Sequence, residues 1–251
     1  GQVREGDPAN FILTKDLKKF EVLATYIKGQ KVAESGKTLI PLVNYEVINN
    51  FNTSLKKSED FQLYASGTKV RVIEALDGQL ITPEIEGEIL IRDGFAESNS
   101  EKDILKITVV NRYQDAPPAV AFIKNFGLKT GAIASSVGHD SHNIIAVGID
   151  DVSICRAVNL LIEAKGGISA VSGEKEEVLP LPVGGIMSPE DGYQVAEAYT
   201  RIDRMAKEMG SSLNSPFMTL SFMALLVIPD LKLSDKGLFD GKKFEFVEVF
   251  F

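Results

Sequence analysis

Apolar runs separated by polar turns divide the first part of the chain into short predicted strands. These runs cover residues 11–13, 20–27 and 31–33. A meander of this size buries little apolar surface on its own, so we expect it to need a partner sheet. Residues 34–68 are polar and aperiodic, which predicts a connector and a domain boundary there.

The strand pattern returns at residue 69 and continues through most of the remaining chain. A long apolar run at residues 104–110 is typical of a central strand, and a turn at Asp77-Gly78 precedes another strand. The complete set of strands predicted in this region covers residues 70–73, 79–82, 104–110, 119–126, 132–134, 144–147 and 168–171.

Two segments with helix signals are expected to pack on this sheet. The first helix is capped by Asp150 or Asp151 and ends at residues 166–167, which are both glycine. The second opens at Ser188 with the sequence SPED and ends at Gly210. Its buried stripe is predicted to consist of Val195, Ala198, Ile202 and Met205. The expected fold class is therefore α+β, a mixed β-sheet with packed helices.

Composition narrows the classes of partner. The chain has 251 residues, of which 44% are apolar, enough for one large domain or two small ones. A net charge of −8 argues against nucleic acid and anionic membranes as partners. The longest apolar stretch, residues 217–229, is too short to span a bilayer. A single cysteine and the lack of a signal-peptide pattern favour the cytoplasm.

Both histidines of the chain lie in one run, ASSVGHDSHN, at residues 134–143 between two predicted strands. Imidazoles bind metals and titrate near neutral pH, so this run is where chemistry is expected. Two histidines alone are a weak metal signal because catalytic zinc usually takes three protein ligands, and we therefore predict no metal site. The alternative, which the sequence leaves open, is a structural loop whose polar side chains bond turn backbone groups.

Other candidate features have simpler interpretations. Cys155 on the first helix is predicted to be core rather than a nucleophile. The apolar residues Phe217, Met218, Phe222 and Met223 suit a purine-sized pocket, although ordinary core is the favoured interpretation. The glycine pair at residues 184–185 has no local explanation, unlike the pair that ends the first helix.

Several long motifs resemble the C-terminal region of microbial adenine deaminases, in the same order from about residue 70 to the end. They are DILKI at 103–107, FGLKTGAIASSVGHDSHNII at 126–145, LPLP at 179–182, PFMTLSF at 216–222 and VIPDLKL at 227–233. Residues 1–33 are similar to the closing strands of the small β-sandwich that flanks amidohydrolase barrels. The resemblance divides the chain into those closing strands, a connector at 34–68 and the C-terminal α+β domain at 69–251.

The resemblance implies an enzyme that hydrolyses adenine to hypoxanthine and ammonia. In this family an upstream (β/α)8 barrel binds a divalent metal, manganese or iron, and a barrel takes about 250 residues, which this chain has no room for. The chain also lacks a His-x-His pair. We therefore expect a C-terminal fragment that is inactive alone, with the missing barrel and adenine as partners and no cofactor or confident catalytic residue of its own. An apolar face left by the missing barrel predicts a homo-oligomer.

The resemblance further implies that the histidine run matters to the enzyme. The substrate-proximal candidates are Ser135, Ser136, His139, Asp140, His142 and Asn143. We expect the last four of them to lie near the barrel mouth, where they would position or enclose adenine. Around Arg112 the sequence departs from the family pattern, with Asn111 before it and Tyr113-Gln114 after it, as it does at Gly138, so the resemblance does not support the Arg112 loop as a contact site. The alternative function is a stand-alone purine-binding or oligomerisation module without catalysis.

Overall fold

The computed structural model describes residues 4–41, 43 and 46–251 and divides into two compact units, residues 1–45 and 46–251. The first unit is an antiparallel meander. Its strands pair in chain order: β1 (Phe11–Thr14), β2 (Val22–Ile27), β3 (Gln30–Glu34) and β4 (Lys37–Thr38). The three strands predicted here are confirmed, and β4 is a further short strand beyond them.

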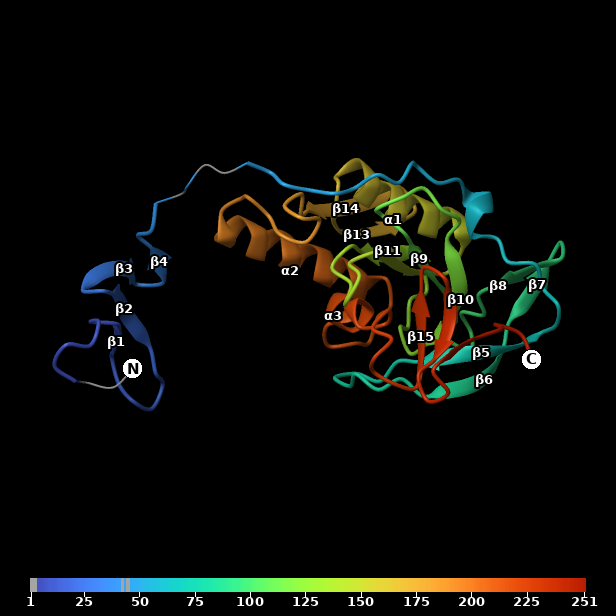
Figure 1. The fold of residues 1–251 in the computed structure, drawn as a ribbon, viewed down its shortest axis with the longest axis horizontal. Coiled ribbons are helices and arrows are strands. Elements are labelled where there is room, and N and C mark those ends of the chain that lie inside the picture. Colours follow the sequence, from blue (N-terminus) through green and yellow to red (C-terminus); the bar gives the residue numbers. More distant parts are fainter. Residues whose placement is uncertain (1–3, 42, 44–45) are drawn as a thin grey trace. The chain divides into compact units, whose positions relative to one another are not determined.

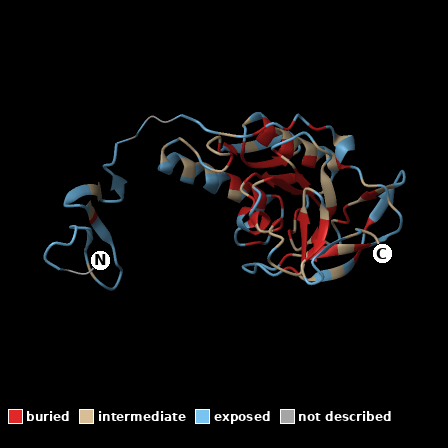
Figure 2. Ribbon diagram, viewed as in Figure 1, coloured by how far each residue is buried: buried red, intermediate tan, exposed pale blue. Residues whose placement is uncertain are grey.

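This meander buries almost nothing by itself. Among its described residues, Ala24 alone is buried, and Figure 2 shows the strands almost entirely in the colour of exposed residues. Its exposed apolar side chains include Phe11, Ile12, Leu13, Val22, Leu23 and Ile27. Such a sheet lacks the buried area that gives independent stability, as its size predicts.

The second unit is built on an eight-stranded mixed sheet with the order β14-β13-β11-β12-β9-β10-β5-β6 (Figure 1). β5 and β10 run parallel, and the other neighbours are antiparallel. The strands are β5 (Lys69–Glu74), β6 (Glu84–Glu88), β9 (Ile104–Val110), β10 (Ala119–Lys124), β11 (Ala132–Ser135), β12 (Ile144–Gly148), β13 (Gly167–Ser172) and β14 (Lys175–Pro180). All residues of β9 are buried, as expected of a central strand.

The sheet carries a separate apolar cluster on each face. On β12, Ile144 and Ala146 belong to the cluster beneath α1 (Asp151–Glu163), while Ile145 and Val147 belong to the opposite cluster. That second layer contains α2 (Gly192–Glu208), α3 (Pro216–Ser221) and a small sheet of β15 (Leu231–Ser234), β16 (Gly237–Asp240) and β17 (Glu245–Val247). The remaining elements are a 3-10 turn, η1 (Ser58–Phe61), and a hairpin of β7 (Leu90–Arg92) and β8 (Phe95–Glu97). The predicted α+β class is confirmed.

Two sequence predictions are wrong in detail. Residues 79–82 are not a strand: Thr82 makes only an isolated bridge to Asp230, and its hydroxyl donates to the Leu231 carbonyl oxygen at 2.8 Å. The second helix does not begin at Ser188: its hydroxyl accepts a bond from the Glu190 N–H at 3.1 Å, but residues 189–190 form a bend and α2 begins only at Gly192. Asp191 caps α2 instead, with Oδ1 accepting from the N–H of Tyr193 at 3.0 Å.

Candidate functional site

The histidine run forms the connection between β11 and β12, which are antiparallel neighbours near the middle of the sheet. The His139 N–H donates to the carbonyl oxygen of Ser221, the last residue of α3, at 2.8 Å. The His142 N–H donates to the Gly138 carbonyl oxygen at 2.7 Å, and His142 has a left-handed backbone with φ +54°. The run is therefore an ordered loop held against the second layer.

Two of the predicted site residues are committed to this loop structure. Ser136 is fully buried; its Oγ accepts from the Gly167 N–H at 2.7 Å and donates to the Gly185 carbonyl oxygen at 2.6 Å. The Ser135 Oγ accepts from the Val137 N–H at 3.0 Å. These bonds satisfy the backbone groups of Val137, Gly167 and Gly185. This is the structural role that the sequence left open as an alternative.

The His139 ring lies at an apolar hollow. It stacks on Phe222 with ring centroids 4.7 Å apart and planes inclined by 23°. Beside it is a cavity of about 200 Å³ whose wall includes Tyr199, Phe217 and Met218. Of the apolar residues proposed for a pocket, Phe217 and Met223 are buried core, whereas Met218 is exposed at the rim of the hollow. The favoured interpretation of ordinary core is therefore wrong for Met218, and the sequence did not place His139 beside Phe217 and Met218.

His142 is half-buried beside His139, with ring centroids 6.1 Å apart. Its Nδ1 is buried and has no hydrogen-bond partner within the described part of the chain. Burial lowers the pKa of His142; the positive charges of Arg112 and His139 lower it further, and Asp140 opposes them. His142 is consequently neutral at pH 7, with one ring nitrogen free of internal contacts. Asp140 itself is exposed.

Arg112, whose loop the sequence did not support as a contact site, packs beside the histidine loop. It is buried, and its Nη1 donates to the Gly184 carbonyl oxygen at 2.7 Å while its Nη2 donates to the Tyr113 hydroxyl at 3.0 Å. A Cβ added to Gly185 would lie 1.7 Å from Nη1. The guanidinium therefore explains Gly185, and the lack of a local explanation for the glycine pair was the signal for this contact; Gly184 is explained only by its left-handed backbone, with φ +63°. The backbone N–H of Arg112 also donates to Oδ1 of the buried Asn143 at 3.3 Å.

The ligands that a divalent metal would need are not gathered here. Across residues 4–41, 43 and 46–251, no three side chains of His, Cys, Asp or Glu come close enough together to hold an ion. His139, Asp140 and His142 are adjacent in sequence but do not form such a set. The donors present do not fit a metal, and no chemical step can be assigned to a metal held by these residues.

Cys155 is a weak nucleophile in this setting. The thiol is half-buried in the cluster beneath α1, and its Sγ donates to the Lys56 carbonyl oxygen at 3.2 Å. Burial raises the pKa of the thiol, so it stays protonated at neutral pH. The prediction that Cys155 packs in the core is confirmed by its apolar neighbours, although the residue itself is half-buried.

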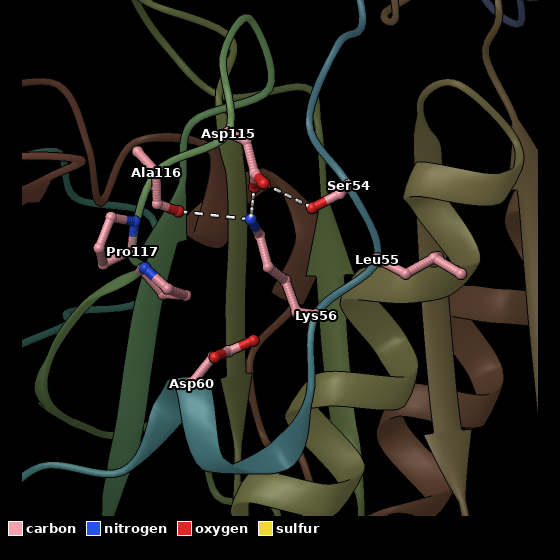
Figure 3. A pocket seen from close by; sticks show the side chains of 8 residues that line it. Ser54, Leu55, Lys56, Asp60, Asp115, Ala116 and Pro117 are labelled. Atoms are coloured by element: carbon pink, nitrogen blue, oxygen red, sulfur yellow. Dashed lines mark hydrogen bonds and ion pairs between the residues drawn. The ribbon is translucent and has the colours of Figure 1, made fainter.

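A second, polar hollow of about 310 Å³ lies where residues 54–56 pass the loop at 115–118 (Figure 3). The buried Lys56 amine contacts the Asp115 carboxylate and donates to the Ala116 carbonyl oxygen at 3.3 Å. The Ser54 hydroxyl donates to the same carboxylate at 2.7 Å. Hydrogen bonds from Lys56 and Ser54 hold the pKa of Asp115 below its ordinary value. The ion pair neutralises Lys56 and Asp115, while Asp60 adds a further carboxylate to the wall of the hollow, and these bonds attach residues 54–56 to the loop at 115–118.

Comparison with known proteins gives a consistent result. Residues 79–245 match a family model described as adenine deaminase C-terminal domain. Three curated relatives, each named adenine deaminase, are from Sulfurovum sp. (strain NBC37-1), Salinibacter ruber and Methanosarcina acetivorans. The chain is 56%, 51% and 50% identical to them, over 99%, 100% and 100% of its length and 45%, 46% and 47% of theirs. It therefore spans about half the length of the curated relatives it matches.

In the described residues, no helix combines the length and apolar character needed to cross a membrane.

Proposed function

Since the chain belongs to the adenine deaminase C-terminal domain family, we propose that it is the C-terminal part of an enzyme that hydrolyses adenine to hypoxanthine and ammonia. In this reaction water adds to the purine carbon that bears the amine, the carbon–nitrogen bond breaks, and ammonia leaves with the transferred proton. The observation that carries the proposal is the match over residues 79–245 to a domain of enzymes about twice as long.

The remaining half of the enzyme would supply the metal. A divalent ion such as manganese or iron, when bound there, activates the attacking water. The described residues of this chain offer no ligand set, so we assign the ion to the upstream barrel and expect the chain alone to be inactive. The exposed apolar meander at residues 11–34 supports this division, because it needs a partner sheet.

Within this chain, we place His139, Asp140 and His142 next to the adenine site. Three observations support this placement: Asp140 is exposed, both imidazoles are half-buried, and Nδ1 of His142 has no internal partner among the described residues. Ser135, Ser136 and Asn143 would then act behind them, since each already bonds the loop or the Arg112 backbone. A neutral His142 nitrogen is suited to a hydrogen bond with a purine or with a barrel residue.

The test is hydrolysis of adenine, followed by ultraviolet absorbance with manganese or ferrous ion supplied. We expect no activity from this chain alone and activity from a chimera that joins the N-terminal part of the Sulfurovum relative to it. In the chimera, His142→Asn should lower kcat/KM by at least about tenfold, a loss of one transition-state contact. Turnover by the isolated chain would overturn the division of labour, and an unaffected His142→Asn chimera would overturn the placement of the histidines.

A second candidate is a purine-binding or oligomerisation module without catalysis. The apolar hollow beside His139 favours purine binding, since a flat ring could lie against Tyr199 and Met218. The exposed meander favours self-association. Calorimetric titration of the isolated chain with adenine, and its sedimentation, test the two parts; tight adenine binding in an inactive chimera would favour this candidate over the enzyme.

A further inference from the structure

Arg112 is a buried cation without a buried anion. It lies two residues after the end of β9, and within the described residues its side chain bonds a carbonyl oxygen and a hydroxyl rather than a carboxylate. Its charge is met instead by the Gly184 carbonyl oxygen and by two rings, with the guanidinium carbon 4.7 Å from the Tyr113 centroid and 5.7 Å from that of Phe51. An arginine in this setting is held by geometry rather than by charge neutralisation, because its planar fork fits several partners at once.

An extended segment, the strap at residues 46–57, fixes this arginine from outside. The N–H groups of Asn52 and Thr53 donate to the Arg112 carbonyl oxygen at 2.7 and 3.2 Å. The Gly184 N–H donates to the Ile48 carbonyl oxygen at 2.7 Å, so the strap also holds the residue that accepts the guanidinium.

Both ends of the strap are anchored. The Asn49 side-chain amide donates to the Lys165 carbonyl oxygen at 2.6 Å. The far end is held where Lys56 meets Asp115 (Figure 3). Phe51, in the middle, is buried in the cluster beneath α1. The strap thus belongs to the packed structure of the second unit.

The inner side of Arg112 reaches the histidine loop by two routes. The Tyr113 hydroxyl accepts from Arg112 Nη2 at 3.0 Å and donates to the Ser141 carbonyl oxygen at 2.7 Å. The Arg112 N–H donates to Oδ1 of Asn143 at 3.3 Å. The two anchored residues are the neighbours of His142, whose left-handed backbone is uncommon for a residue other than glycine. The bond to Ser141 therefore restricts the backbone before His142, and the bond to Asn143 restricts the residue after it.

We propose that Arg112 is a positioning residue that, with Tyr113, fixes the backbone around His142, and that the strap at residues 46–57 holds Arg112 in place for this purpose. The importance of His142 rests on the proposed function, but the coupling itself does not. Movement of the strap would then reach the histidine loop through Arg112, by its guanidinium and Tyr113 on one route and by its backbone N–H and Asn143 on the other.

The sharpest test removes one oxygen atom. Tyr113→Phe keeps the ring against the guanidinium and deletes the hydroxyl that joins Arg112 to Ser141. The chain contains two histidines, so nuclear magnetic resonance resolves both imidazoles during a pH titration. His142 is surrounded by Arg112, His139 and Asp140, and its pKa is lowered mainly by burial. Loosening the loop exposes the ring, so the variant should shift the His142 resonances and raise its pKa toward the ordinary value.

Tyr64→Phe is the matched control, because Tyr64 is exposed and its ring packs at a tilt against Phe95 with ring centroids 4.6 Å apart, a contact that phenylalanine retains. It should leave both histidines unchanged. Arg112→Lys, which keeps the charge but cannot contact Gly184 and Tyr113 together, should move His142 in the same direction as Tyr113→Phe. If Tyr113→Phe folds and leaves the His142 shifts and pKa as in the parent chain, the inference is wrong.

Activity of the chimera separates this inference from the proposed function. If both hold, Tyr113→Phe should lower kcat about tenfold with a smaller change in KM, because the histidine is misplaced rather than removed. A shifted His142 titration with unchanged turnover would support the positioning role and contradict the catalytic placement of His142. An unchanged titration would contradict the positioning role whatever the activity.

Discussion

The Ser136 hydroxyl donates to the Gly185 carbonyl oxygen at 2.6 Å and links the start of the histidine loop to the glycine pair beneath Arg112. Oγ of Ser136 also accepts from the Gly167 N–H, so one buried side chain joins three segments that are distant in sequence. Ser136 therefore holds both the start of the histidine loop and the glycine pair that contacts Arg112.

Replacing that hydroxyl should destabilise the chain. Ser136→Ala leaves the buried Gly167 N–H and Gly185 carbonyl oxygen each without a bond, and we expect the free energy of unfolding to fall by about 1–3 kcal/mol. Urea unfolding measures the change. Ser212→Ala, at an exposed position, is the control and should change it by less than about 0.5 kcal/mol. Equal effects of the two substitutions would contradict a stabilising role for the bonds that Ser136 makes with Gly167 and Gly185.

Gly185 should not tolerate a side chain. Its φ is +74°, and a Cβ would lie 1.7 Å from Nη1 of Arg112, so Gly185→Ala must displace a buried guanidinium. We expect this substitution to lower the free energy of unfolding by about 3 kcal/mol or more. Gly78→Ala is a matched control with φ +71° and open space around the added Cβ, and it should show only the backbone strain of about 1 kcal/mol. Thermal unfolding that shifts equally in both variants would show that strain, not the arginine contact, determines the glycine.

The inner strands of the central sheet could be predicted from the sequence because each is a short run of mostly apolar residues, which indicates a buried strand without knowledge of its neighbours. β12 is apolar on both faces, β11 is apolar apart from Ser135, and β9 is apolar apart from Lys106 and Thr108, so all three are recognised as buried strands from their own sequences. β6 was missed because its sequence, EIEGE, is mostly charged; it lies at the edge of the sheet, where such residues face solvent. The six-residue α3 is too short to show a helical period.

The loop that we propose as the site could be recognised from the sequence, but the different roles of its residues could not. The concentration of both histidines between two apolar strands marked the loop. Nothing local separates the hydroxyl of Ser136, which bonds Gly185, from the exposed carboxylate of Asp140. The contact between Arg112 and Gly184 joins residues far apart in the chain, so only the packing of the strap and the sheet reveals it.

His142 should make stability depend on pH in a defined direction. Its pKa is lowered in the folded chain, so between the folded value and the ordinary value near 6.5 the unfolded state binds more protons. Stability is then fully present above the unfolded pKa and falls as the pH drops below it. His142→Asn removes the titration and suits the left-handed backbone, since asparagine adopts it readily. The difference in unfolding free energy between parent and variant, measured from pH 7.5 to 5, should shift against the parent as the pH falls; a constant difference would contradict the lowered pKa.

The strap should contribute measurably to the stability of the second unit. Phe51 is 7% exposed and packs in the cluster beneath α1 while its ring lies near the Arg112 guanidinium. Phe51→Ala removes this burial, and we expect the free energy of unfolding to fall by about 3 kcal/mol, at the lower end for a buried phenylalanine because the strap lies at the surface. Phe20→Ala, at a residue 55% exposed in the first unit, is the control and should have little effect on the same transition. If Phe51→Ala unfolds at the same urea concentration as the parent chain, the strap is not part of the packed unit, and its hold on Arg112 is too weak to reach the histidine loop.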